Sequence, residues 1–121
     1  MAQNLALVIE DDEDLSEIFT KALEKAGFDV ETIRDGEAAQ KRLKEDVVPT
    51  VIALDLHLPF VDGATLLKQI HKDERYGNVR IILTTADAVQ AEFLHDQATI
   101  VLIKPISFSQ LRDISARLKS G

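Results

Sequence analysis

The sequence predicts an α/β domain in which helices cover both faces of a parallel sheet. Strand-length segments, most of them continuously apolar, recur five times along the 121 residues. A segment in which apolar residues recur every three or four positions follows each of them, as in an amphipathic helix. Apolar strands are buried on both faces, and strict strand–helix alternation with right-handed crossovers is the pattern of a parallel sheet between two helical layers.

The expected strands are short and lie between residues that break regular structure. The third is the most apolar, and Pro49 separates it from the preceding helix. Asp55 follows that strand directly, where an ionised group is costly to desolvate. The five expected strands are Leu5–Ile9, Phe28–Ile33, Val51–Leu54, Arg80–Thr84 and Ile100–Ile103.

The expected helices are bounded by recognisable start and stop residues. The first contains Leu15 and stops before Gly27, which favours a helix C-terminus. Ser107 and Gln110 have the S-x-x-Q spacing of a capping box and open the last helix. The segment Ala88–Gln97 is a weak helix, because few of its residues are strongly apolar. The two remaining helices are expected from Asp35 to about Glu45 and from Gly63 onward.

Composition limits the classes of function. Hydrophobic residues make up 45% of the chain, enough for one packed core, so we expect a single domain over residues 1–121. A net charge of −7 without an evident basic patch argues against direct binding of nucleic acid. No apolar run approaches the ~20 residues of a membrane span, and no basic segment precedes the first strand. With no cysteine in the chain, these features favour a cytoplasmic protein without membrane insertion.

Polar side chains follow four of the expected strands and would meet at one edge of the sheet. In open parallel sheets, ligands bind outside the carboxyl ends of the strands. Taken singly, acidic residues here can simply start a helix, where the helix dipole favours negative charge. The residues in question are Glu10, Asp11 and Asp12 after the first strand, Asp55 after the third, Thr84 and Thr85 at the end of the fourth, and Lys104 with Pro105 after the fifth.

Carboxylates gathered at one edge repel one another unless a cation relieves them. Two unit charges ~4 Å apart repel by roughly 4 kcal/mol at an effective dielectric of ~20. Mg²⁺ prefers oxygen ligands and is often held by one or two carboxylates together with phosphate oxygens. A further carboxylate can then attack phosphorus, while a lysine and a hydroxyl stabilise the transferred phosphoryl oxygens. We therefore expect Asp55 to be buried and to receive a phosphoryl group, and Asp55→Asn or Asp11→Asn to raise the melting temperature without Mg²⁺.

Four motifs in this order resemble a known family over almost the whole chain. They are "LVIEDD" at 7–12, "DLHLPFVDG" at 55–63, "TA" at 85–86 and "KP" at 104–105. Together they resemble the receiver domain of bacterial two-component response regulators, of which chemotaxis regulators are an example. The resemblance implies a flavodoxin-like three-layer sandwich, (βα)5, with a central five-stranded parallel sheet in the order 2-1-3-4-5.

The resemblance also assigns roles at the carboxyl edge. Asp55 would be the phosphoacceptor. Glu10 and Asp11 would be the acidic pair around Mg²⁺, for which Mn²⁺ can substitute. Asp11 and Asp55 would be metal ligands, and the main-chain carbonyl of His57 would be another.

Two further residues receive roles from the same resemblance. Thr85 would be the switch hydroxyl, chosen over Thr84 because Ala86 follows it. Lys104 would pair with the phosphoryl group, and its bond to Pro105 is expected to be cis. The implied partners are a histidine kinase or histidine phosphotransfer protein and a downstream output protein or domain. A homodimer is compatible with this role, and the domain is expected to signal rather than to act as an enzyme.

Some polar residues near these motifs have alternative interpretations. Asp12 is expected to cap the first helix rather than bind metal. His57 is expected at the rim, where the family tunes phosphate lifetime. Asp87 matches a second rim position or caps the following helix. His71 and His95 lie among polar neighbours and are expected to be surface residues, not a phosphohistidine or metal site.

The chain departs from the family pattern between the fourth and fifth strands. Lys104 follows Thr85 by 19 positions, fewer than is usual, and Val101 stands where the family usually has Tyr or Phe. These departures motivate an alternative function, a phosphorylation-independent pseudo-receiver interaction module of the same fold. An aspartyl phosphatase normally has a second Asp where this chain has His57. A flavin-binding flavodoxin is disfavoured because the acidic "EDDED" would repel a phosphate.

Overall fold

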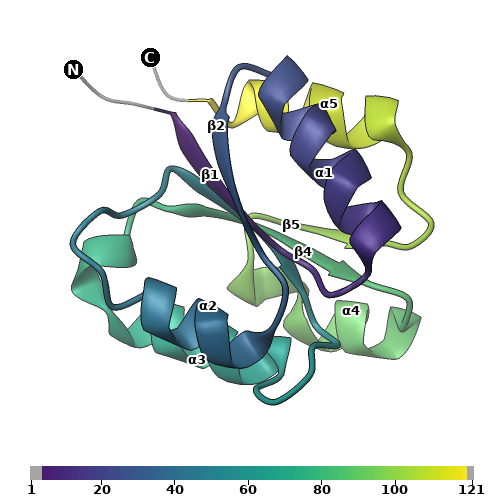
Figure 1. Cartoon of the computed structure of the whole chain (residues 1–121). Coiled ribbons are helices and arrows are strands. Elements are labelled where there is room, and N and C mark those ends of the chain that lie inside the picture. Colours follow the sequence, from purple (N-terminus) through teal and green to yellow (C-terminus); the bar gives the residue numbers. More distant parts are fainter. Residues whose placement is uncertain (1–3, 120–121) are drawn as a thin grey trace.

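Five parallel strands form one sheet in the order β2-β1-β3-β4-β5, which confirms the predicted fold class and strand order (Figure 1). The structure is a computed structural model that describes residues 4–119. The three central strands are buried along nearly their whole length. The strands are β1 Leu5–Ile9, β2 Asp29–Ile33, β3 Val51–Asp55, β4 Arg80–Thr85 and β5 Ile100–Ile103.

Two apolar clusters, one on each face of the sheet, hold the helices in place. On one face Phe19 of α1 and Leu111 of α5 share a cluster with the central strands. On the other face Ala39 of α2, Leu67 of α3 and Leu94 of α4 belong to the second cluster. Figure 1 shows α1 beside α5 and α2 beside α3. The helices are α1 Glu13–Lys25, α2 Gly36–Arg42, α3 Gly63–Lys72, α4 Ala88–Leu94 and α5 Phe108–Arg117, with the 3₁₀ helices η1 Glu74–Tyr76 and η2 His95–Gln97.

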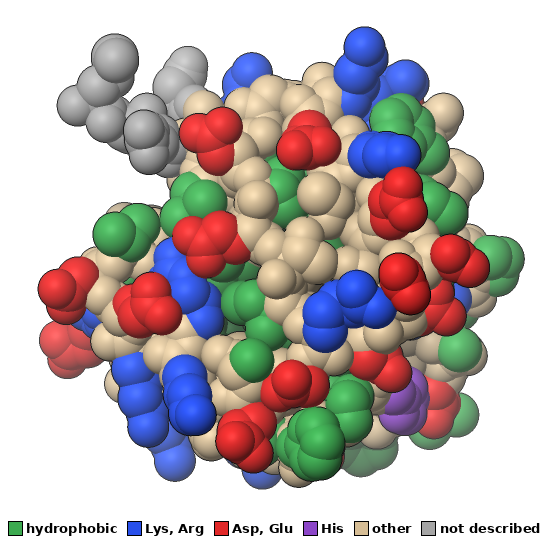
Figure 2. All heavy atoms as spheres, viewed as in Figure 1, with side chains coloured by type: hydrophobic (Ala, Val, Ile, Leu, Met, Phe, Trp, Pro, Cys, Tyr) green, Lys and Arg blue, Asp and Glu red, His purple; other side chains and the backbone are tan. Residues whose placement is uncertain are grey.

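The surface matches the mixed, net acidic composition. Figure 2 shows acidic and basic side chains intermixed on the face in view. No helix within residues 4–119 has the length and apolar character needed to cross a membrane.

Helix α2 is shorter than predicted, because it ends at Arg42 and not near Glu45. The Arg42 side chain is buried and donates from Nε to Glu31 Oε2 at 2.7 Å and from Nη1 to the Val47 carbonyl at 2.8 Å. Drawing the Val47 carbonyl back onto Arg42 requires the chain to turn after α2. The α-helix therefore ends before the predicted position near Glu45.

Helix α4 is also shorter than the predicted segment Ala88–Gln97. The α-helix ends at Leu94, and the chain continues as the 3₁₀ helix η2. His71 Nε2 of α3 lies 2.6 Å from the Gln97 carbonyl oxygen, which fixes the end of η2. With so few strongly apolar residues in this segment, tertiary contacts of this kind decide where the helix ends.

Side-chain caps begin the five described α-helices and set where each one starts. In each case a side-chain oxygen accepts from a main-chain N–H two or three residues on, the geometry of an N-cap. The predicted caps at Asp12, Asp87 and Ser107 are confirmed. The bonds join Asp12 to Leu15, Asp35 to Ala38, Asp62 to Thr65, Asp87 to Val89 and Gln90, and Ser107 to Gln110.

Helix α3 starts where the chain passes closely over the end of β3, which requires a glycine. A Cβ atom on Gly63 would lie 2.3 Å from the Asp55 carbonyl oxygen and 2.6 Å from Leu56 Cα. The Gly63 N–H donates to the Leu56 carbonyl at 3.0 Å. The β3–α3 connection is thus held directly against the backbone of Asp55.

We predict that Gly63→Ala lowers the free energy of unfolding by about 1–3 kcal/mol, because the backbone around Asp55 must shift to make room. Urea unfolding measures this change. Gly77→Ala is the matched control, since its Cβ would come no closer than 3.4 Å to the Glu74 carbonyl oxygen, an ordinary contact. Equally small effects of the two substitutions would contradict the packing described here.

Candidate functional site

Asp55 is buried at the carboxyl end of the central strand β3, as predicted, with 3% of its surface exposed. It pairs in register with Thr84 of β4. Its Oδ1 accepts from the His57 N–H at 3.1 Å, and its Oδ2 lies 3.4 Å from Lys104 Nζ. One oxygen is therefore held by the backbone and the other faces a cation.

Glu10 lies beside Asp55 and is equally buried, with 1% of its surface exposed. Its Oε1 accepts from Lys104 Nζ at 2.9 Å, and its Oε2 accepts from the Asp12 N–H at 3.2 Å. Lys104 thus contacts two carboxylates that come from different strands. The Lys104–Pro105 peptide bond is cis, which confirms that prediction.

Asp11 completes a group of three carboxylates with Glu10 and Asp55. One carboxylate oxygen from each residue lies within 4.8 Å of the other two. Glu10 and Asp55 are buried, whereas Asp11 is exposed, so the group opens to solvent on one side. An all-oxygen donor set that is reachable from water fits a hard divalent cation.

Burial and charge crowding shift the acid–base properties of this cluster. Burial raises the pKa of Glu10 to about 7; Lys104 opposes that rise, and the neighbouring charge of Asp55 adds to it. Burial alone would lower the pKa of Lys104, but its contacts with Glu10 and Asp55 leave that pKa raised. Lys104 therefore stays charged, and one amine faces two buried carboxylates.

Thr85 lies at the same edge, with its side chain turned to the start of α4. Its Oγ1 accepts from the Asp87 N–H at 3.0 Å, and its carbonyl accepts from the Lys104 N–H at 2.8 Å. Thr84 and Thr85 are both fully or almost fully buried. Among the described residues no hydrogen bond joins Thr85 to Asp55, so its role as the switch hydroxyl stays a prediction.

The histidines lie where the sequence indicated. His57, His71 and His95 are all exposed. His71 contacts the Gln97 carbonyl, and His95 Nδ1 lies 2.8 Å from the Glu92 carbonyl oxygen. The contacts of His71 and His95 are structural contacts at the surface. The ligand role of the His57 main-chain carbonyl stays a prediction.

One unusual residue beside the site was missed. Phe60 has a φ of 72° and an exposed side chain. The Val61 N–H donates to the Pro59 carbonyl at 2.9 Å, so Phe60 is the centre of a γ-turn with positive φ, a rare and strained form. Glycine or asparagine would have signalled such a turn, whereas phenylalanine gives no such signal.

The short segment between Thr85 and Lys104 contains two short helices in place of the predicted single one. The seven-residue α4 and the three-residue η2 replace one continuous helix. Val101 of β5 is partly buried against the cluster on the α2–α3–α4 face and pairs in register with Leu83. A branched aliphatic side chain thus occupies the position where the family usually has an aromatic ring.

A family model described as the response regulator receiver domain matches residues 6–116 of the chain. The chain belongs to this family. Membership implies a phosphoacceptor role for this receiver domain in two-component signalling, and the fold and the buried Asp55 agree with it.

Several curated relatives are longer regulators. RpaA of Synechocystis, named as a DNA-binding dual master transcriptional regulator, is 39% identical over 66% of this chain and 33% of its own length. PhoB of Rhizobium meliloti is 34% identical over 93% of this chain and 49% of its own. PhoP of Bacillus subtilis is 32% identical over 94% and 46%. The receiver domain thus spans about half or less of these relatives.

Solved receiver domains share the fold. The chemotaxis response regulator CheY4 of Vibrio cholerae has a TM-score of 0.85 at 22% identity, covering 97% of this chain and 99% of its own. The receiver domain of the Francisella response regulator 1452 has a TM-score of 0.80 at 26% identity, covering 96% of each chain. The five-stranded order 2-1-3-4-5 is therefore the receiver fold.

We predict that Glu10→Gln makes the protein progressively more stable, relative to the unsubstituted chain, as the pH rises from about 4.5 to about 7 without divalent cations. The folded-state pKa of Glu10 is about 7 against an ordinary 4.5. Below 4.5 the carboxyl is protonated in both states. As the pH rises toward 7 the unfolded chain loses this proton first, so Glu10 lowers stability.

Urea unfolding at several pH values measures this difference, which reaches on the order of 1–3 kcal/mol. Glu17→Gln on the exposed face of α1 is the control, because the pKa of Glu17 is lowered by Lys21 and not raised by burial. If the free energies of unfolding of Glu10→Gln and of the unsubstituted protein changed with pH in parallel, the pKa of Glu10 would not be raised in the folded state.

Proposed function

We propose that Asp55 accepts a phosphoryl group from the phosphohistidine of a histidine kinase or histidine phosphotransfer protein. The observation that supports this most directly is the position of Asp55, which is buried at the end of β3. One of its carboxylate oxygens lies 3.4 Å from Lys104 Nζ. Its carboxylate also lies within 4.8 Å of a carboxylate oxygen of Glu10 and of Asp11. An Asp55 oxygen forms the new bond to phosphorus, and the P–N bond to the donor imidazole breaks. The imidazole nitrogen keeps the electron pair of that bond.

The other residues of the site stabilise the charge of the transferred group. Lys104, already between two carboxylates, pairs with a phosphoryl oxygen, as a preorganised cation does in phosphoryl transfer. Glu10, Asp11, Asp55 and the His57 carbonyl would hold Mg²⁺, or Mn²⁺ in its place, which supplies positive charge to the phosphoryl oxygens. Thr85 supplies a hydroxyl at the same edge: its oxygen accepts from the Asp87 N–H, and its proton can be donated to a phosphoryl oxygen.

The output of this reaction is a change of surface. A phosphoryl group adds roughly −1.5 to −2 charge at Asp55. Attraction of Thr85 and Lys104 toward it would shift the balance between two arrangements of the α4–β5 region. The partner that reads this change is an output protein or domain, and the domain signals rather than acting as an enzyme. The cytoplasm is the compartment that fits such an exchange between soluble partners.

We predict that intact mass spectrometry shows the gain of one phosphoryl group after incubation with acetyl phosphate and Mg²⁺. Asp55→Asn and omission of Mg²⁺ are each expected to abolish the gain. Asp87→Asn is the matched control, since it neutralises an aspartate at the same edge that caps α4 and leaves Asp55 in place.

An adduct that persists in Asp55→Asn would assign the phosphoacceptor to another residue. No adduct on the unsubstituted protein, together with no binding of a beryllofluoride phosphoryl mimic, would favour the phosphorylation-independent interaction module.

A further inference from the structure

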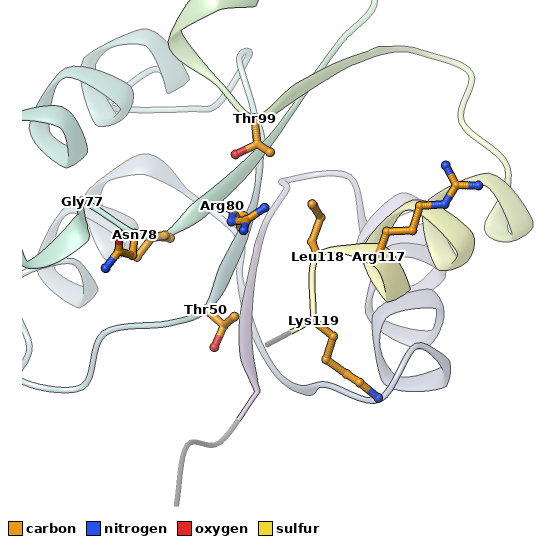
Figure 3. Close-up of a pocket in the computed structure, with 9 residues that line it drawn as sticks. Thr50, Gly77, Asn78, Arg80, Thr99, Arg117, Leu118 and Lys119 are labelled. Carbon is orange, nitrogen blue, oxygen red and sulfur yellow. The ribbon is translucent and has the colours of Figure 1, made fainter. Parts of the chain in front are cut away.

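A cavity of about 490 Å³ lies at the amino-terminal edge of the sheet, and Figure 3 shows residues that line it. Asp55 lies at the opposite, carboxyl edge, at the end of β3. The cavity is formed where β3, β4 and β5 begin, by the connection from η1 to β4, and by the end of α5. Its volume falls in the range of about 300–1,000 Å³ typical of small-molecule sites. The reaction proposed for Asp55 uses no residue that lines this cavity.

The charge of the cavity is opposite to that of the whole chain. Arg80, Arg117 and Lys119 line it, and no Asp or Glu within residues 4–119 does, although the chain has 21 acidic and 14 basic residues. None of the three forms an ion pair with a carboxylate among residues 4–119. Three cations without a carboxylate partner favour an anionic ligand.

Arg80 is the cation that the fold itself does not explain. Arg117 and Lys119 lie at the C-terminal end of α5, where the helix dipole favours positive charge. Arg80 begins strand β4 and has no such dipole to complement. Its backbone N–H donates to the Thr50 carbonyl at 3.0 Å, which fixes its place between β3 and β5.

Two threonines and one apolar side chain lie around Arg80. Figure 3 shows Arg80 between Thr50 and Thr99, with Leu118 opposite, while Arg117 and Lys119 extend away from it along the rim. Thr99 Oγ1 accepts from the Ile81 N–H at 2.9 Å, so its hydroxyl proton is directed elsewhere and can donate to a ligand. Leu118 is partly buried and gives the cavity an apolar side.

We propose that this amino-edge cavity binds a small organic phosphate. The Arg80 guanidinium pairs with the phosphate oxygens in the two-point geometry that guanidinium favours. Thr99 donates a further hydrogen bond, and Leu118 contacts the organic part. Arg117 and Lys119 add positive charge at the rim.

Charge and size favour this ligand over the alternatives. A phosphate ester carries close to two negative charges near neutral pH and a carboxylate carries one. The phosphate is therefore favoured by Arg80 together with the positive charge that Arg117 and Lys119 add at the rim. A nucleic acid needs an extended basic surface, whereas this chain has a net charge of −7 and the three cations border one cavity.

The test is a titration with adenosine 5′-monophosphate, followed by amide NMR at constant ionic strength and without Mg²⁺. We expect saturable shifts centred on Thr50, Arg80 and Thr99. Arg80→Gln is expected to weaken binding by about tenfold or more, the loss that follows from removing a hydrogen bond to a charged group. Arg112→Gln removes the same charge from an α5 residue outside the cavity and is expected to bind as the unsubstituted protein does.

Two matched compounds separate the parts of the ligand. Adenosine, which lacks the phosphate, is expected to give no saturable shift, and inorganic phosphate is expected to bind more weakly than the nucleotide. Shifts that are absent, that are unchanged in Arg80→Gln, or that centre on Lys104 would overturn the proposal. Binding of adenosine as tight as that of the nucleotide would also overturn it, and so would binding of inorganic phosphate as tight as that of the nucleotide.

The result is separable from the chemistry of Asp55. The same titration of Asp55→Asn is expected to give the same affinity, because the cavity and Asp55 lie at opposite ends of the strands. Dispersed amide spectra of Arg80→Gln would confirm that the variant is folded. We expect this result because the Arg80 side chain is exposed.

Discussion

The contact of one amine with two buried carboxylates is the interaction on which the candidate site depends. Lys104 lies 2.9 Å from Glu10 and 3.4 Å from Asp55, and both carboxylates are almost fully buried. A buried charge without a partner is strongly destabilising. Because Asp11 adds a third carboxylate within 4.8 Å, the single amine leaves negative charge at this edge, and the site retains an attraction for a cation.

The parallel sheet brings Lys104, Glu10 and Asp55 together. Glu10 and Lys104 directly follow β1 and β5, and Asp55 is the last residue of β3. The order β2-β1-β3-β4-β5 places the carboxyl ends of those strands at one edge. Gly63 then holds the β3–α3 connection against Asp55, and the Lys104 N–H bonds the Thr85 carbonyl across to β4. Fold and chemistry are thus linked, since the same topology that buries the strands collects their terminal charges.

The strands, the helix caps and the edge that carries the site could be predicted from the sequence, because each is encoded by residues that lie close together along the chain. Apolar runs define the strands, and Asp12, Asp87 and Ser107 are recognisable caps. Once the strand order is expected, the carboxyl-edge position of Asp55, Glu10 and Lys104 follows from topology. Whether Thr85 acts as the switch does not follow, because in this structure its hydroxyl bonds to the Asp87 N–H.

The errors and omissions come from contacts between distant segments. Arg42 ends α2 by bonding Glu31 and Val47, and nothing in the helical pattern of α2 encodes those partners. His71 fixes η2 from a different helix. The positive φ of Phe60 depends on the tight packing of its loop, in which the Pro59 carbonyl also accepts from the Gly36 N–H. Such features could not be predicted from the sequence, because they depend on contacts that form only when the chain is folded.

The melting temperature of Asp55→Asn with and without Mg²⁺ tests most directly whether charge crowding organises this site. Removing one carboxylate should raise the melting temperature without Mg²⁺, and Asp11→Asn should do the same. Mg²⁺ should stabilise the unsubstituted protein more than either variant, because a cation that binds the folded state stabilises it. Lower melting temperatures for both variants, with no effect of Mg²⁺, would instead make these carboxylates hydrogen-bonded structural groups.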